Sequence, residues 1–110
     1  MEQEKIDKLI EVLQNVKKRP QMYFGQNDDV DKAHIFLWGF MLAAISVLNI
    51  EFNDCIENRG KATNKRGFEY TTFGIALEAA QKDFDNSQIV IEQIEIEIEM
   101  WKIFRDGFEI

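Results

Sequence analysis

Residues 19–25 read Arg19-Pro20-Gln21-Met22-Tyr23-Phe24-Gly25 and contain two residues that interrupt helices. Pro20 lacks a backbone N–H and pushes the residue before it out of the helical region. Gly25 tolerates a positive φ, which lets the chain reverse direction. The bulky side chains between these two residues are costly to leave in water. We therefore expect an elbow between two helices, with its methionine, tyrosine and phenylalanine packed in the core.

Apolar residues keep helical spacing on both sides of this elbow. Before it they recur at intervals of three and four within residues 2–18, which predicts one amphipathic helix. After it, residues 27–29 offer three N-cap candidates for a second helix that we expect to reach about Asn53. This helix is apolar on most sides, so we expect it to be the central helix. Gly39 within it costs about 1 kcal/mol relative to alanine, which predicts close packing against a neighbouring backbone.

A short helix and a loop are expected next. Phe52, Cys55 and Ile56 keep helical spacing, and Gly60 is a suitable C-cap for the helix that they predict. Residues 60–70 are the segment richest in loop formers and carry three basic residues. We interpret them as a solvated loop that could add a second contact to a partner.

Two longer helices are expected in the remainder of the chain. Thr71 or Thr72 is the predicted cap of the first of them. Its expected inward face consists of Phe73, Ala76, Leu77, Ala80 and Phe84. Residues 85–87 should end this helix and cap the last one.

The last segment is ambiguous because two periods overlap in it. From Ile94 to Glu99 the chain alternates strictly between isoleucine and glutamate, which is typical of a strand. Helical spacing instead puts apolar residues and glutamates on opposite faces, and it explains about twenty residues rather than about six. We take helix and keep strand as the alternative. The predicted fold is all-α: one domain, residues 1–110, forming a bundle of four main helices plus a short helix.

Composition narrows the class of protein. The net charge of −7 argues against nucleic acid as the main partner. The longest apolar run, residues 35–48, falls short of the roughly 20 residues that span a bilayer, so we expect no membrane segment. The acidic start of the chain lacks the pattern of a secretion signal, and Cys55 is the single cysteine. We therefore expect a cytoplasmic protein in a reducing compartment.

Two resemblances involve the elbow. It resembles the Arg-Pro-Gly-Met-Tyr-Ile-Gly segment of type II topoisomerase B subunits, but Gln21 replaces a glycine and the nucleotide motifs of that family are not found downstream. We interpret this as convergence on one turn. Over most of its length the chain resembles small bacterial proteins that combine Arg-Pro-x-Met-Tyr-x-Gly with a Phe-Leu-x-Gly-Tyr-like segment, here Phe36-Leu37-Trp38-Gly39-Phe40. This resemblance implies a protein-binding role of the immunity or antitoxin type and carries no catalytic residues.

An acidic face near the C-terminus is the best candidate for a functional surface. Residues 75–110 contain nine acidic and three basic residues, a net charge of −6. The side chains expected to share this face are Glu92, Glu95, Glu97, Glu99, Asp83 and Asp85. Acidic groups steer a basic partner and select it by charge. Together with the resemblance, this face predicts binding to a basic toxin protein.

Two other functions stay open. Glu92, Glu95 and Glu99 could hold Mg²⁺ in a small metal-dependent nucleotide hydrolase, although a solvated face is the simpler interpretation. His34 is the single histidine, so a di-iron site of the ferritin kind, which needs two Glu-x-x-His motifs, is excluded. The apolar second helix could instead form the interface of a structural homodimer. We expect no enzyme activity, cofactor or bound metal, and either a monomer or a homodimer.

Overall fold

The computed structural model describes residues 2–71 and 74–107, and these residues form six α-helices and no β-strand. The helices are α1 (Glu2–Lys18), α2 (Pro20–Phe24), α3 (Val30–Leu48), α4 (Phe52–Lys65), α5 (Ala76–Gln81) and α6 (Asn86–Gly107). The predicted all-α fold is confirmed, and the strand alternative for the last segment is wrong. The buried hydrophobic side chains form one cluster.

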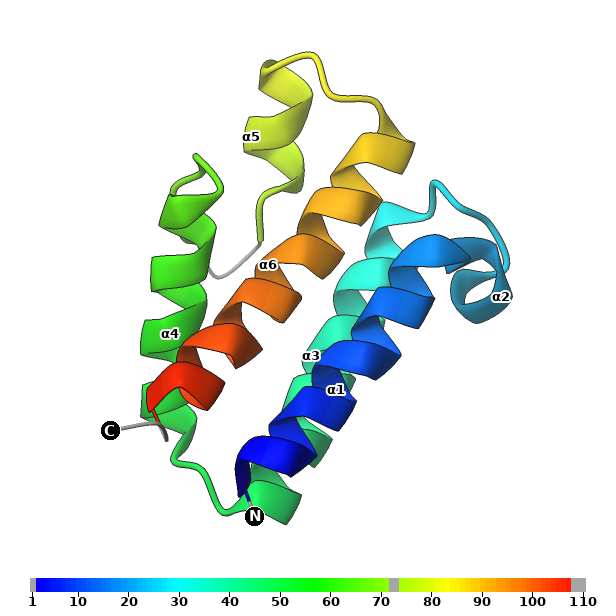
Figure 1. Cartoon of the computed structure of the whole chain (residues 1–110). Coiled ribbons are helices and arrows are strands. Elements are labelled where there is room, and N and C mark those ends of the chain that lie inside the picture. The colour runs from blue at the N-terminus through cyan, green and yellow to red at the C-terminus, as the bar shows by residue number, and fades with distance from the viewer. Residues whose placement is uncertain (1, 72–73, 108–110) are drawn as a thin grey trace.

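Helix α6 is the central element of the fold. In Figure 1 it runs between α1 and α4, and it also contacts α3 and α5. Ile94 and Ile96 are both buried. Residues two positions apart in a helix are separated by about 200°, so these two side chains point to nearly opposite sides of α6. The strand-like alternation therefore belongs to a helix that is covered on several sides. The prediction that the helix after the elbow is the central one is wrong.

Helix α3 packs against the core with one face only. Its buried residues are Ala33, Leu37, Met41, Ala44 and Ile45. The N-cap is confirmed, because the Asp29 side chain accepts a hydrogen bond from the Lys32 backbone N–H at 3.0 Å. The helix ends well before the expected Asn53, since Asn49 adopts the left-handed conformation with φ of 56°.

The elbow contains the single helical turn α2, which begins at Pro20 and ends at Phe24, with Gly25 as its C-cap in the left-handed conformation at φ of 79°. Phe24 is buried, and its ring meets the ring of Phe36 edge-on with 5.3 Å between centroids. The prediction that Met22 and Tyr23 join the core is wrong, because their exposed fractions are 68% and 44%. A single turn can direct only one side inward, and here that side carries the proline and Phe24.

Helix α4 is longer than expected. It continues through Gly60 to Lys65, so the predicted loop at 60–70 is largely the second half of a helix. Ala62 and Thr63 in this half are buried. Their packing outweighs the roughly 1 kcal/mol cost of an interior glycine, because tertiary contacts supply most helical stability in proteins.

Helix α5 is shorter than expected and shows a different face to the core. Leu77 and Ala80, predicted to point inward, are exposed, whereas Ile75 and Ala79 are buried. The predicted cap Thr72 and the predicted core residue Phe73 lie outside the described residues.

The start of α6 is confirmed as a capped helix N-terminus. Asp85 Oδ1 accepts a hydrogen bond from the Gln88 backbone N–H at 2.8 Å. In return, the Asp85 backbone N–H donates to Gln88 Oε1 at 2.8 Å. This reciprocal arrangement is a capping box, and it satisfies two backbone N–H groups at the helix start.

Truncating a buried side chain of α6 should be far more destabilising than truncating an exposed one elsewhere. We expect Ile98→Ala to lower the free energy of unfolding by about 2–5 kcal/mol, because Ile98 is fully buried and its loss leaves a cavity. Leu77→Ala removes a side chain that is 75% exposed, so the change should stay within about 0.5 kcal/mol. Urea unfolding followed by circular dichroism measures both values. Equal, small losses would contradict the central position of α6.

Candidate functional site

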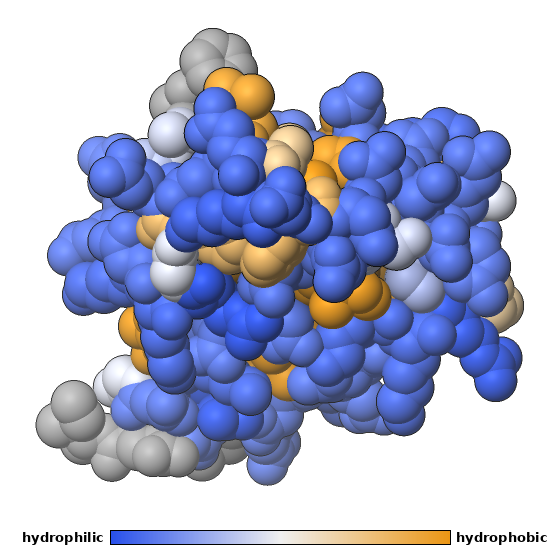
Figure 2. Space-filling view, turned by 90° about the horizontal axis from the view of Figure 1, so that it is seen from above, coloured by the Kyte–Doolittle hydropathy of each residue, from blue (hydrophilic) through white to orange (hydrophobic). Residues whose placement is uncertain are grey.

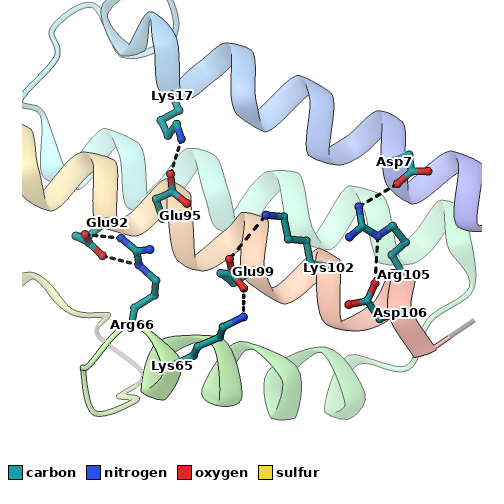
Figure 3. Close-up of polar contacts among 10 residues, drawn as sticks. All are labelled: Asp7, Lys17, Lys65, Arg66, Glu92, Glu95, Glu99, Lys102, Arg105 and Asp106. Carbon is teal, nitrogen blue, oxygen red and sulfur yellow. Dashed lines mark hydrogen bonds and ion pairs between the residues drawn. The ribbon is translucent and has the colours of Figure 1, made fainter. Parts of the chain in front are cut away.

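Three glutamates of the predicted acidic face are paired with basic side chains of the same chain. Figure 3 shows Glu92, Glu95 and Glu99 along α6, each facing a lysine or arginine from α1 or the end of α4. The ion pairs are Arg66–Glu92 at 2.7 Å, Lys17–Glu95 at 2.5 Å and Lys65–Glu99 at 2.9 Å. A basic partner would have to displace these cations, so the three carboxylates are not a free acidic surface.

The two aspartates of the predicted face lie in the turn before α6. Asp83 is exposed and has a positive φ of 65°. Asp85 is engaged in capping the helix. Their positions are explained by the turn and the cap, without a partner.

The prediction that Glu97 belongs to the acidic face is wrong, because its side chain is fully buried. At about 100° per residue, Glu97 lies about 200° around α6 from both Glu95 and Glu99. This places it on a side of α6 that other helices cover. The strict alternation in the sequence therefore combines glutamates from two different sides of the helix.

Glu97 is held by partners from α4 and from its own helix. Arg59 Nη2 donates a hydrogen bond to Glu97 Oε1, and Trp101 Nε1 donates to Glu97 Oε2 at 3.0 Å. The Arg59 guanidinium also lies 5.2 Å from the centroid of the Trp38 ring and 3.2 Å from Met41 Sδ. Three helices thus meet at one buried ion pair.

This ion pair is costly to break. Burial raises the pKa of Glu97, although the Arg59 charge and the Trp101 N–H favour the carboxylate. Removing one partner would leave an uncompensated buried charge, which typically costs about 3–5 kcal/mol. The sequence does contain a signal for the burial of Arg59, because this residue lies between Cys55 and Ala62 at the spacing of a buried helical stripe. Ending the predicted helix at Gly60 concealed that stripe.

A small cavity of about 30 Å³ adjoins this pair where α3, α4, α6 and the segment before α5 meet. Arg59 Nε and Gln93 Oε1 are buried there, and neither has a hydrogen-bond partner among the described residues. Burial, followed by the nearby Arg59 charge, lowers the pKa of His34 in the cavity wall, so its imidazole is neutral near pH 7. The cavity thus offers one donor and one acceptor to a neutral group no larger than a water molecule or two.

Within residues 2–71 and 74–107, no three His, Cys, Asp or Glu side chains are grouped so as to hold a metal ion. Cys55 is buried in the core, with its Sγ 3.6 Å from Met100 Sδ. Burial, together with the Glu97 charge, raises the pKa of the Cys55 thiol to about 12. A thiol in this setting is a packing group rather than a nucleophile.

The outer face of α3, which we define as Ile35, Gly39, Leu42, Ala43 and Val47, is exposed. It is apolar apart from the neighbouring Ser46, whose hydroxyl donates a hydrogen bond to the Leu42 backbone C=O at 3.0 Å. The exposed fractions of Ile35 and Val47 are 70% and 77%. Among the described residues, Gly39 has no neighbour within 4 Å of an added Cβ, so they do not provide the close packing predicted for it. By contrast, the end of the molecule seen in Figure 2 is largely hydrophilic, with hydrophobic residues in separate groups.

A groove of about 380 Å³ runs between α1 and α3 along this outer face. Its lining is apolar apart from two lysines at the rim and consists of Lys5, Lys8, Leu9, Phe40, Ala43, Ala44, Val47 and Leu48. Among the described residues, α3 is the one helix whose length and composition would let it cross a membrane, a criterion that core helices and signal sequences also meet.

Comparisons with protein-family models, with curated proteins and with solved structures found no match.

The pH dependence of stability should differ in sign between Glu97 and Glu99. The pKa of Glu97 is raised above its usual 4.5, so its contribution is complete below that pH and is lost as the pH rises. We expect the unfolding free energy of the wild type minus that of Glu97→Gln to fall as the pH increases from about 4.5. The hydrogen bond from Lys65 lowers the pKa of Glu99. The same difference for Glu99→Gln should therefore fall as the pH decreases below 4.5.

Urea unfolding of the three proteins between pH 3 and pH 8 measures these differences. Slopes of the same sign for both variants would be inconsistent with the opposite environments of the two carboxyl groups.

Cys55 should resist alkylation until the chain unfolds. At pH 8 a thiol with a pKa of about 12 is almost entirely protonated, and the thiolate is the reactive form. We expect iodoacetamide to label the folded chain far more slowly than the chain in urea, as measured by mass spectrometry. Labelling of the folded chain at the rate of free cysteine would refute the buried position.

Proposed function

We propose that this chain is a non-enzymatic protein-binding module, and that its docking surface is the outer face of α3, which receives a helix of the partner protein. The observation that carries this proposal is the exposure of Ile35 and Val47 on either side of an unpacked Gly39. Contiguous exposed apolar surface of this kind is typical of a binding site. Burying it against a partner would remove it from water and gain hydrophobic free energy.

The spacing of small residues on this surface favours a helix as the docked element. Gly39 and Ala43 lie one helical turn apart, so both are on the same face of α3. Small residues at this spacing let two helix backbones approach closely. Larger side chains at Ile35, Leu42 and Val47 surround them and supply the apolar contact area. The glycine, which weakens the isolated helix, is then explained by the partner.

The immunity or antitoxin role stays a prediction, and we do not place it on the glutamates of α6. Glu92, Glu95 and Glu99 are neutralised by neighbouring cations, and Glu97 is buried. The same ion pairs weigh against the nucleotide hydrolase alternative, because Mg²⁺ would have to compete with three basic side chains for these carboxylates.

Photocrosslinking from the outer face tests the proposal. Benzoylphenylalanine is introduced at position 35 or 47 in cells that produce the chain, and at position 77 as a matched control. Leu77 is 75% exposed but lies on α5. We expect a protein adduct from positions 35 and 47 and none from position 77. Adding Gly39→Leu should remove the adduct, because leucine at this position keeps the partner helix away.

Gly39→Leu is a suitable control because, apart from the backbone of α3 itself, no atom of residues 2–71 and 74–107 lies within 4 Å of the new Cβ. The fold should therefore be retained, as circular dichroism can verify. An absence of adducts, equal yields from all three positions, or adducts that persist with Gly39→Leu would each overturn the proposed docking surface.

A further inference from the structure

We propose that the helix received by the outer face is α3 of a second copy of this chain, packed antiparallel about a two-fold axis near residue 41. This inference rests on the proposed function, because it names the occupant of the same surface. Two observations support it: the spacing of residues along α3, and the positions of an exposed aromatic residue and a groove.

The outer face is self-complementary about residue 41. In an antiparallel pair related by a two-fold axis, a residue before the axis faces the partner's residue at the same distance after it. Residues 35 and 47 are each six positions from 41, and residues 39 and 43 are each two positions from it. Ile35 would therefore face Val47, and Gly39 would face Ala43. Large aliphatic side chains meet at both ends, and small residues meet where the backbones come closest.

The shape of the outer face along its edge next to α1 is compatible with the same two-fold axis. At one end, the half-exposed Tyr23 packs against Phe36, with 6.0 Å between ring centroids. At the other end lies the groove between Leu9 of α1 and Val47 of α3. Figure 1 shows α1 running alongside α3. The short helix α2 lies near the start of α3, and the N-terminal end of α1 lies near the end of α3. A two-fold rotation about the centre of α3 therefore brings Tyr23 of each copy to the groove of the other.

Light scattering and sedimentation equilibrium test the oligomeric state. We expect a particle of twice the 12.9 kDa chain mass that dissociates on dilution. Ile35→Glu/Val47→Glu should raise the dissociation constant by at least about tenfold, since it opposes acidic groups within an apolar contact. Leu77→Glu, which alters an equally exposed leucine on α5, should leave the constant unchanged. A wild-type monomer, or equal effects of both changes, would refute the dimer.

A charge pair tests the orientation. In the antiparallel dimer, Ile35→Glu/Val47→Lys places each glutamate opposite a lysine of the other copy, so association should recover relative to the variant with two glutamates. In a parallel dimer, both positions would face their own kind and association would stay lost. A double variant that dimerises no better than the two-glutamate variant overturns the antiparallel arrangement.

The failure of this inference and that of the proposed function can be told apart. A crosslinked adduct of twice the chain mass from positions 35 and 47 supports both. An adduct of another mass, from a chain that is monomeric, refutes the second copy and leaves a different protein on the outer face. If the monomeric chain floats with phosphatidylcholine–phosphatidylglycerol vesicles and Ile35→Glu/Val47→Glu stops it, then a lipid surface covers the outer face and both proposals are wrong.

Discussion

Helix α6 is covered by α1, α3 and α4, and every polar group on its covered sides therefore needs a partner inside the protein. Glu97 is the most demanding of these groups, because a carboxylate without water costs several kcal/mol unless it is paired. Arg59 and Trp101 supply the hydrogen bonds, and Arg59 can do so only if α4 lies alongside α6. The pair thereby couples the position of α4 to that of the central helix. It also brings Trp38 of α3 to the same point, through its contact with the guanidinium.

The central position of α6 determines how much of α3 the chain can bury. Because α3 covers one side of α6, five of its residues reach the core and its opposite side stays exposed. The most apolar helix of the chain is therefore peripheral, which is unusual when the chain is considered alone. A second chain that covers the outer face would give Gly39 the close neighbour that the described part of this chain does not provide. The proposed dimer thus completes a core that the single chain leaves open on one side.

Ion pairs within the chain determine how much of its net negative charge is available at the surface. Half of the acidic excess of residues 75–110 is located on α6, but three of its glutamates meet cations from other segments of the chain. Two of those cations, Lys65 and Arg66, belong to the segment that the sequence suggested as a solvated loop. A charge count along the chain cannot detect this, because the partners are 26 to 78 residues apart in sequence.

The sequence by itself determined the elements that depend on neighbours within a few residues. These are the amphipathic first helix, the elbow with its proline and left-handed glycine, the caps at Asp29 and Asp85, and the helical nature of the last segment. Only the tertiary structure decided which helix is central, how far α4 extends beyond Gly60, and whether Glu97 faces water. The physical reason is that periodicity reports which residues share a face of a helix, whereas burial depends on how many other helices cover that face. Several helices cover α6, whereas no helix of the described residues covers the outer face of α3.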